Sequence, residues 1–276
     1  MKTNFKVVLI TGGSSGIGRA IGVYLTKKGL TVYGTTRNLA KHSDFQDFEL
    51  LEMDVNQPES IKRAVGDLLM KENRLDVLIN NAGVGITGPL EETPNEEILK
   101  TFGTNFIGPL NVIKAVLPKM REQNSGLIIN ITSIAGYMGL PYRGIYSASK
   151  GALELITESL RMETKDFGIQ LTCLAPGDFA TNIAAGRYHA PVLENSPYKR
   201  KYGAILKSID QDVDEGGNPE DVGRKIFQII HTKKPKIHYK VGAPLQKISV
   251  LLKKLLPDLW YEKLLIKHSQ KDDNGA

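Results

Sequence analysis

The sequence predicts an α/β protein with a doubly wound, mostly seven-stranded parallel sheet and helices on both of its faces. Two observations indicate this fold: short apolar runs recur along the chain, and longer segments with helical periodicity separate them. The third is their order, because strands that alternate with helices of this length form parallel sheets through right-handed crossovers. No internal repeat or linker interrupts the alternation in the 276 residues, so we expect a single domain.

The expected strands are apolar runs bounded by turn residues, and they cover 7–10, 31–33, 48–51, 77–79, 127–131, 169–174 and 236–239. Helical periodicity lies between them, over 16–28, 59–73, 95–121, 146–167 and 219–231. The last of these helices has a clear start signal, because Asn218 precedes Pro219 and two acidic residues follow. Only residues 38–47 separate the second and third strands, which leaves room for a stub of helix at most.

Two segments fall outside this alternation. Residues 183–217 mix Tyr, Lys, Arg, Pro and Gly without clear periodicity, so we predict a mobile substrate lid there. From 246 to 268 helical periodicity returns, interrupted at Pro257, with Lys253, Lys254 and Lys263 among the polar positions. The apolar positions are Ile248, Leu251, Leu252, Leu255, Leu256, Leu259, Trp260 and Leu264. We therefore expect a core of residues 1–245 and a C-terminal amphipathic extension, 246–276.

The extension has three interpretations. Packing on the protein's own sheet or on a sister subunit is favoured over a membrane-surface anchor, and a partner-binding helix comes last. The expected assembly is a homodimer or homotetramer.

Composition excludes several classes of protein. With 41% hydrophobic and 24% charged residues, the chain resembles neither a disordered protein, a collagen nor a coiled coil. No run of apolar residues is long enough to span a membrane, and the first residues lack the apolar stretch of a signal peptide. The single cysteine, Cys173, cannot form an internal disulfide and is expected to be an inert thiol in a buried strand. A cytoplasmic location is the default expectation.

The charge balance is basic, with 36 Lys and Arg against 30 Asp and Glu. This excess of +6 is compatible with nucleic acid, anionic lipid or a phosphorylated ligand. No basic stripe with interleaved aromatic residues supports nucleic acid, so we expect none as a partner. His231, His238 and His268 have no metal-ligand spacing, so we expect ordinary surface residues and no metal.

The first expected strand leads directly into a glycine-rich turn and then a helix. Glycines allow the close backbone approach, and a helix N-terminus offers unpaired N–H groups to a pyrophosphate. This position after the first strand of an alternating pattern is typical of a dinucleotide site. The residues of the turn are Thr11, Gly12, Gly13, Ser14, Ser15, Gly16, Ile17 and Gly18.

The end of the second strand selects the nucleotide. NAD-binding proteins of this fold place an acidic residue there for the ribose 2′-hydroxyl, whereas a cation accommodates the 2′-phosphate of NADP. The strand ends in Thr36 and Arg37, with no acid. We therefore expect NADP(H) as the cofactor, with Arg37 on its 2′-phosphate.

A tyrosine and a lysine lie on one helical face at the other end of the site. Tyr146 and Lys150 are four residues apart, and a cation beside a phenol favours the phenolate. Ser133 ends the fifth expected strand, where a doubly wound sheet builds its binding site. Alone, a Tyr-x3-Lys pair is common and mostly accidental, so the combination of the three residues carries the argument.

These motifs together make the chain resemble the short-chain dehydrogenase/reductase family over nearly its whole length. In family order, they are Thr-Gly-x3-Gly-x-Gly at 11–18, Asn80-Asn81-Ala82-Gly83, Asn105, Ser133, Tyr-x3-Lys at 146–150 and Pro-Gly-x3-Thr at 176–181. The resemblance implies a Rossmann-type fold and a catalytic tetrad of Asn105, Ser133, Tyr146 and Lys150. It also implies adenine contacts from Asp54 and Val55, adenosine-side contacts from Asn81, Ala82 and Gly83, and nicotinamide contacts from Pro176, Gly177 and Thr181.

The resemblance implies hydride transfer between a nicotinamide and a carbonyl or secondary alcohol. Tyr146 would donate the proton in reduction and accept it in oxidation, and Ser133 would position the substrate oxygen. Lys150 would lower the pKa of the tyrosine and bind the nicotinamide ribose. Asn105, at an expected local helix distortion, would hold a water that links Lys150 to solvent.

The expected substrate is a small-molecule carbonyl or alcohol. Residues 138–142, the strand end at 32–37 and the short second crossover resemble the hydroxysteroid and retinol dehydrogenase branch, which implies a bulky apolar substrate. Apolar residues near the expected site fit this, or belong to the core: Met138, Leu140, Phe179 and Ile183. The main alternative is a nucleotide-sensing regulatory protein without activity. An epimerase or dehydratase is less favoured, because those enzymes usually carry a larger substrate domain.

Overall fold

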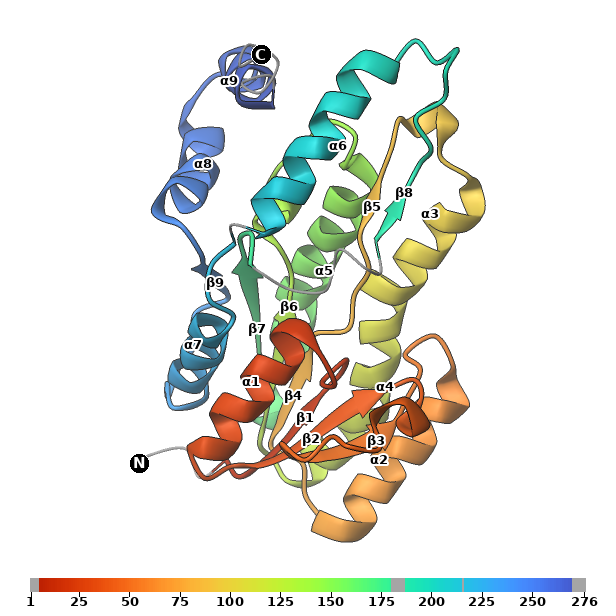
Figure 1. Cartoon of the computed structure of the whole chain (residues 1–276). Helices are drawn as coiled ribbons and strands as arrows, with labels where there is room; N and C mark the ends of the chain where they lie inside the picture. The colour runs from red at the N-terminus through yellow and green to blue at the C-terminus, as the bar shows by residue number, and fades with distance from the viewer. Residues whose placement is uncertain (1–4, 180–186, 215, 270–276) are drawn as a thin grey trace.

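A central sheet of seven parallel strands organises the molecule (Figure 1). The computed structural model describes residues 5–179, 187–214 and 216–269. In spatial order the strands are β3 (Glu49–Glu52), β2 (Thr31–Thr36), β1 (Val7–Ile10), β4 (Val77–Asn80), β6 (Gly126–Ile131), β7 (Ile169–Pro176) and β9 (His238–Val241). β1 pairs with both β2 and β4, so the strand order reverses direction there. Such a reversal opens a crevice at the carboxyl ends of the strands.

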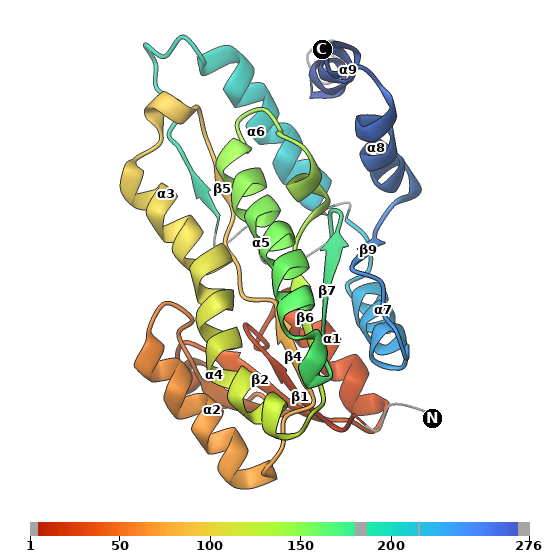
Figure 2. The same ribbon diagram turned by 180° about the vertical axis from the view of Figure 1, so that it is seen from behind.

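Helices cover both faces of this sheet and bury an apolar layer on each. Figure 1 shows α1 (Gly16–Lys27) and α7 (Glu220–Ile230) in front, where Ile21 and Ile226 are buried in one core cluster. Figure 2 shows α2 (Pro58–Glu72), α4 (Gly108–Glu122) and α5 (Gly144–Glu163) on the opposite face. Leu68 of α2 and Val116 of α4 belong to the second cluster. The predicted seven-stranded, two-faced architecture is confirmed.

The short second crossover is also confirmed. Between β2 and β3 the chain forms only a 3₁₀ turn, η1 (Leu39–His42). The predicted start of α7 is correct as well, because the Asn218 side-chain oxygen accepts from the Glu220 N–H at 2.9 Å. Three other 3₁₀ turns connect the larger elements, namely η2 (Leu90–Glu92), η4 (Ile134–Tyr137) and η5 (Lys165–Phe167).

The helix predicted over 95–121 is divided by a π-helical segment. α3 (Asn95–Phe102) passes into η3 (Gly103–Ile107), and α4 follows. The Gly108 N–H donates to the carbonyl of Gly103, five residues back. Pro109 has no N–H, so it cannot give the Asn105 carbonyl its α-helical partner. The expected distortion at Asn105 is therefore present and has a cause in the sequence.

The expected lack of regular structure over 183–217 is wrong for most of its described part, whereas the substrate lid itself stays a prediction. Residues Lys199–Asp214 form α6, and β8 (Tyr188–His189) pairs with β5 (Ile86–Thr87). Tyr202 is buried and donates to the carbonyl of Ala190 at 2.8 Å, and its ring lies 5.4 Å from that of Tyr142. Tyr202, Ile205, Leu206, Ile209 and Val213 have the spacing of an amphipathic helix, so this stretch carried a helical signal that was not recognised. α6 lies beyond the carboxyl ends of the strands (Figure 1).

The C-terminal extension forms two helices, α8 (Pro244–Leu255) and α9 (Asp258–Ser269), with the predicted break at Pro257. Val250 and Tyr261 are buried against Ile134 and Met138. Six of the eight predicted apolar positions are nevertheless exposed, so this stripe does not pack on the protein's own sheet: Ile248, Leu251, Leu255, Leu259, Trp260 and Leu264. None of the helices in the described ranges is long and apolar enough to cross a bilayer.

Candidate active site

The glycine-rich turn lies where β1 meets α1, as predicted. Gly12 and Gly16 adopt positive φ angles of 66° and 52°, which L side chains rarely reach. A methyl group on Gly18 would lie 2.2 Å from the carbonyl oxygen of Gly12, so α1 approaches the turn closely. Ser15 is the N-cap of α1 and is exposed, Ser14 is partly exposed, and Ile17 is buried in the wall of a cleft. The turn and the helix start form a backbone cradle.

The loop after β4 is fastened to this turn by hydrogen bonds. Thr11 Oγ1 accepts from the backbone N–H groups of Asn81 and Ala82, both at 3.0 Å. Asn81 Nδ2 donates to the carbonyls of Thr11 and Gly12 at 3.0 and 3.2 Å. A methyl group on Gly83 would lie 3.3 Å from Lys150 Nζ. This loop therefore connects the glycine-rich turn to the surroundings of Lys150.

Arg37 and Asp54 lie at the open side of the crevice. Arg37 follows β2 and is exposed, and it makes no hydrogen bond or ion pair with the described part of the chain. Asp54 follows β3, and its Oδ1 accepts from the Asn56 N–H at 2.9 Å. Val55 is buried against Gly108. The Arg37 guanidinium is thus available to a ligand.

Tyr146, Lys150 and Ser133 converge on one cleft, together with Asn81 and Gly83. Tyr146 lies in the first turn of α5, and Lys150 Nζ is 6.0 Å from its ring centroid. Ser133 follows β6, and its Oγ accepts from the Ala135 N–H at 3.2 Å, which leaves the hydroxyl proton free to donate. Ser133 and Tyr146, 13 residues apart in the sequence, thus lie close together at the carboxyl edge of the sheet.

Lys150 is buried, and its ammonium donates to the carbonyl of Ile131 at 3.0 Å. Burial lowers the pKa of Lys150, while Tyr146 and Glu154 act in the opposite direction. Burying an ammonium is costly unless negative or dipolar groups face it. The Ile131 carbonyl, Tyr146 and Glu154 therefore offset part of the cost of burying the Lys150 ammonium.

Asn105 is buried, and its side chain clasps the loop after β4. Its Oδ1 accepts from the Val84 N–H at 2.8 Å, and its Nδ2 donates to the Val84 carbonyl at 2.9 Å and to Ser149 Oγ at 3.1 Å. Both side-chain N–H groups are thus used. Pro109 leaves the backbone carbonyl of Asn105 without its α-helical donor, so this oxygen can accept a hydrogen bond from water.

The loop after β7 closes the cleft on the side of α8. Gly177 donates to the carbonyl of Val241 at 2.8 Å, and Pro176 and Gly177 line the cleft. Gln246 of α8 donates to Asp178 Oδ2 at 2.7 Å, and a methyl group on Gly177 would overlap its side chain. The predicted contacts Thr181 and Ile183 lie outside the described residues.

Sequence reasoning missed two arginines of the cleft. Arg143 lies over the Tyr146 ring at 5.5 Å, and Arg187 packs against Gly85. Arg143 is three residues before Tyr146, which was the available signal, whereas Arg187 is distant in sequence. Of the predicted apolar residues, Phe179 lines the cleft, while Met138 and Leu140 pack towards α8 and α9.

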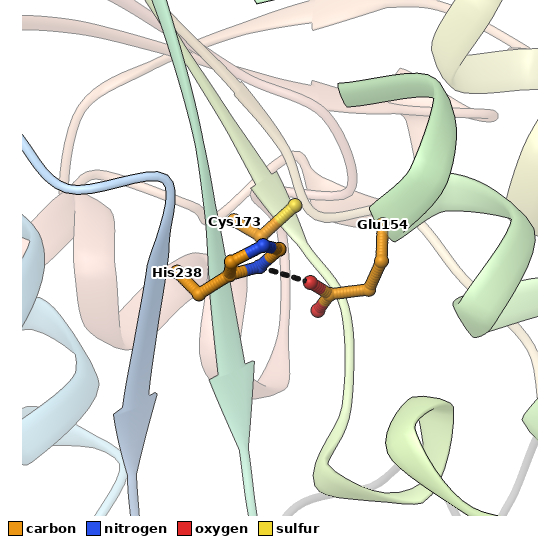
Figure 3. Close-up of side chains that lie close together, drawn as sticks. All are labelled: Glu154, Cys173 and His238. Atoms are coloured by element: carbon orange, nitrogen blue, oxygen red, sulfur yellow. Dashed lines mark hydrogen bonds and ion pairs between the residues drawn. The ribbon is translucent and has the colours of Figure 1, made fainter. Parts of the chain in front are cut away.

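Behind the cleft, Glu154, Cys173 and His238 form a compact cluster (Figure 3). His238 Nδ1 lies 2.6 Å from Glu154 Oε2, and its Nε2 lies 2.9 Å from Glu158 Oε1. His238 is therefore not the ordinary surface residue we expected. Its two partners lie 84 and 80 residues away in the sequence, so no local pattern could indicate them. Cys173 is buried, as predicted, and burial raises the pKa of its thiol. Hydrogen bonds already engage both ring nitrogens of the histidine.

The family follows from comparison with known proteins. The family model described as short chain dehydrogenase matches residues 6–191. The chain belongs to the short-chain dehydrogenase/reductase family, whose members are oxidoreductases, and it is a dehydrogenase or reductase acting on CH–OH or C=O groups.

Two curated relatives and one solved structure extend the comparison. A 3-ketodihydrosphingosine reductase of Bacteroides thetaiotaomicron is 39% identical, covering 92% of this chain and 94% of the relative. An NADPH-dependent 3-dehydrocapnine reductase of Ornithobacterium rhinotracheale is 31% identical, with 96% and 98% covered. A short-chain dehydrogenase/reductase of Burkholderia phymatum in complex with NAD superposes with a TM-score of 0.78 at 26% identity, covering 92% and 94%.

Proposed function

We propose that the chain is an NADP(H)-dependent reductase that interconverts a carbonyl and a secondary alcohol on a bulky, apolar, lipid-like substrate. The observation that carries the proposal is the convergence of Tyr146, Lys150 and Ser133 on one cleft. Tyr146 is the proposed general acid and base. A steroid-like substrate was equally compatible with the sequence, but the ketodihydrosphingosine reductase among the relatives favours a lipid with a long chain.

The described residues fit a dinucleotide. The positive φ angles of Gly12 and Gly16, and the close approach of Gly18, build a cradle at the positive end of the α1 dipole. Its proposed contacts are Ile17 at the pyrophosphate, Ser14 and Ser15 near the 2′-phosphate, Asp54, Val55 and Asn81 to Gly83 at the adenosine, and Pro176, Gly177 and Thr181 at the nicotinamide. Tyr146 and Lys150 complete the proposed contacts, at the nicotinamide ribose.

NADP(H) is proposed over NAD(H) because of the charges at the end of β2. Arg37 is exposed there, without an intramolecular partner among the described residues. The neighbouring carboxylate, Glu52, instead accepts from the Leu39 N–H at 3.3 Å. The name of one relative includes NADPH, whereas the Burkholderia structure holds NAD, so cofactor choice needs a direct test.

Each catalytic side chain has a task that follows from its position. The bound nicotinamide supplies or accepts the hydride. Tyr146 gives its phenolic proton to the substrate oxygen in reduction, and Ser133 donates a hydrogen bond to the same oxygen. The buried Lys150 ammonium stabilises the tyrosinate that remains. The Asn105 carbonyl holds a water through which solvent restores the proton.

Tyr146→Phe tests the catalytic assignment. It removes the acidic proton but keeps the ring under Arg143, so turnover with a long-chain 3-keto lipid should fall by about 10²-fold or more. NADPH binding, followed by fluorescence of the cofactor, should change only a few fold. Near-normal turnover of the Phe variant would contradict the proposal. Tyr142→Phe is the matched control, because that ring contacts α6 instead of Lys150.

Arg37→Asp tests the cofactor. An acid at this position would repel the 2′-phosphate and accept from a 2′-hydroxyl, so the NADPH to NADH ratio of kcat/KM should fall by about tenfold or more. Lys41→Asp, on the nearby turn η1, controls for a general change of charge. An unchanged ratio would argue against an Arg37 contact to the phosphate.

A further inference from the structure

The outer face of α8 and α9 is apolar and has no partner among the described residues. We define this outer face by the exposed side chains Leu245, Ile248, Leu251, Leu255, Leu259, Trp260 and Leu264. Leu255, Leu259 and Trp260 are 70%, 71% and 66% exposed. On α8 the apolar residues are three or four positions apart, so they form one stripe. Large contiguous apolar patches on a surface mark sites of interaction.

α9 is apolar on more than one side. Tyr261 and Leu265 contact the body of the protein, while Leu259, Trp260 and Leu264 are exposed. α9 therefore presents apolar side chains both to the body of the protein and to the outside, with charged residues between them. Both ribbon views place α8 and α9 on the outside of the sheet edge formed by β9, where a large surface has access (Figure 1, Figure 2).

The charges around the outer face are mostly positive. Residues 244–269 contain five lysines and two acidic residues. One lysine is neutralised, because Lys253 Nζ lies 2.7 Å from Asp258 Oδ1. Lys247 and Lys254 are exposed on α8, seven residues apart, and flank the apolar stripe. Burial, and then the ammonium of Lys254, lowers the pKa of Lys240 on the adjacent strand β9. Positive charge is thus concentrated beside the apolar residues.

We propose that the outer face of α8 and α9 docks the protein onto a lipid bilayer that carries anionic headgroups. Leucines with a tryptophan, flanked by lysines, are typical of helices that lie in the interface. Each helix has 12 residues, about 18 Å in length, so neither spans the ~30 Å hydrocarbon core. The helices therefore lie along the surface, with their leucines inserted and their lysines at the headgroups.

A second copy of the chain is the competing occupant, and charge disfavours it. In a two-fold dimer the same patch meets itself, which would bring the lysines of one copy towards those of the other. An anionic bilayer neutralises them instead. Charge complementarity therefore selects the membrane.

The docking surface is connected to the active site through two contacts. Gln246 of α8 binds Asp178 in the loop after Gly177, and Tyr261 of α9 donates to Met138 Sδ at 2.8 Å, close after Ser133. A docked enzyme would hold its cleft near the bilayer, where a lipid-like substrate resides. The docking itself does not depend on the proposed function, because binding to vesicles needs no substrate.

The chain offers its own reporter for this test, because Trp260 is its single tryptophan. Full-length protein is titrated with vesicles of phosphatidylcholine containing phosphatidylglycerol, and with phosphatidylcholine alone. We expect a blue shift of the emission with the anionic vesicles, quenching by brominated acyl chains, and weaker binding at high salt. Absence of the shift and the quenching with anionic vesicles would overturn the proposal.

Leu255→Glu should weaken vesicle partitioning by at least about tenfold, since a leucine that inserts into the bilayer is replaced by an anion. The matched control is Met70→Glu on α2, because Met70 is 79% exposed and α2 lies far from α8 and α9 in both ribbon views. Equal partitioning of the two variants would overturn the proposal. So would a blue shift that grows with protein concentration without vesicles, because it would identify a second copy as the occupant.

Discussion

Leucines of the central sheet and leucines of the C-terminal helices have opposite environments in the same chain. Leu171 of β7 is fully buried between helices, as are Leu9 of β1 and Leu78 of β4. Leu255 of α8 and Leu259 of α9 are largely exposed, although their spacing predicted an equally good apolar stripe. The comparison teaches that periodicity identifies a face of a helix, whereas burial depends on whether the fold provides a partner for it.

The largest expected difference concerns the buried side of this comparison. Leu171→Ala should lower the free energy of unfolding by about 2–5 kcal/mol, because it removes packed methyl groups and leaves a cavity. Urea denaturation followed by circular dichroism measures it. A loss below about 1 kcal/mol would mean that the core around β7 relaxes or is not close-packed.

A buried polar contact should come next. Glu154 accepts from the hydroxyls of Thr132 and Tyr137 and faces His238. Glu154→Gln places an N–H₂ group where these donors need an acceptor, so we expect a loss of about 1–3 kcal/mol in urea denaturation. Glu158→Gln, on the more exposed side of His238, should cost less. Equal losses would argue against a special role for the buried carboxylate.

The buried cation of the site predicts a dependence on pH. Burial lowers the pKa of Lys150, so between that value and the ordinary 10.5 the folded protein binds fewer protons than the unfolded chain. Stability therefore rises with pH through this window. Lys150→Met removes the effect, so the unfolding free energy of the wild type relative to the variant should increase with pH, by at most about 1.4 kcal/mol per unit. A flat or falling difference would contradict the burial of the charged lysine.

The smallest effect is expected on the exposed side. Leu255→Ser should change the free energy of unfolding by no more than about 0.5 kcal/mol, since the side chain is already largely in water. The same urea experiment applies, at low protein concentration and without lipid. A loss comparable with that of Leu171→Ala would show that the outer face is covered in solution, and the contrast between the two regions would disappear.

Most of the fold was predictable because each strand of the sheet has its own local sequence pattern. The apolar runs and their turn residues indicated all seven strands, and Asn218 marked the start of α7. α6 was missed although Tyr202, Ile205, Leu206 and Ile209 have helical spacing, because that short stripe lies within a stretch rich in Lys, Arg, Pro and Gly. The side of the C-terminal helices that faces outward could not be predicted, since a pattern along one helix contains no information about its neighbours.

The site was predictable for the residues that lie at strand ends or at the helix starts that follow them. Tyr146, Lys150 and Ser133 meet at one cleft because a strand end and the next helix start are adjacent in this topology. Arg187 and His238 were not predicted to matter, because their contacts join segments far apart in sequence. Their roles depend on tertiary packing alone.

The π-helical turn at Gly103–Ile107 sets how α3 and α4 are rotated about their axes relative to each other. A π turn accommodates one residue more than an α turn, and each residue of an α-helix rotates the chain by about 100°. Deleting a single residue there would restore continuous winding, and the phase of α3 would slip by that angle against α4. Either the apolar side of α4 would turn away from the sheet, or the Asn105 side chain would lose its hydrogen bond with Val84. One residue of length thus sets the rotational register between the scaffold and its loop.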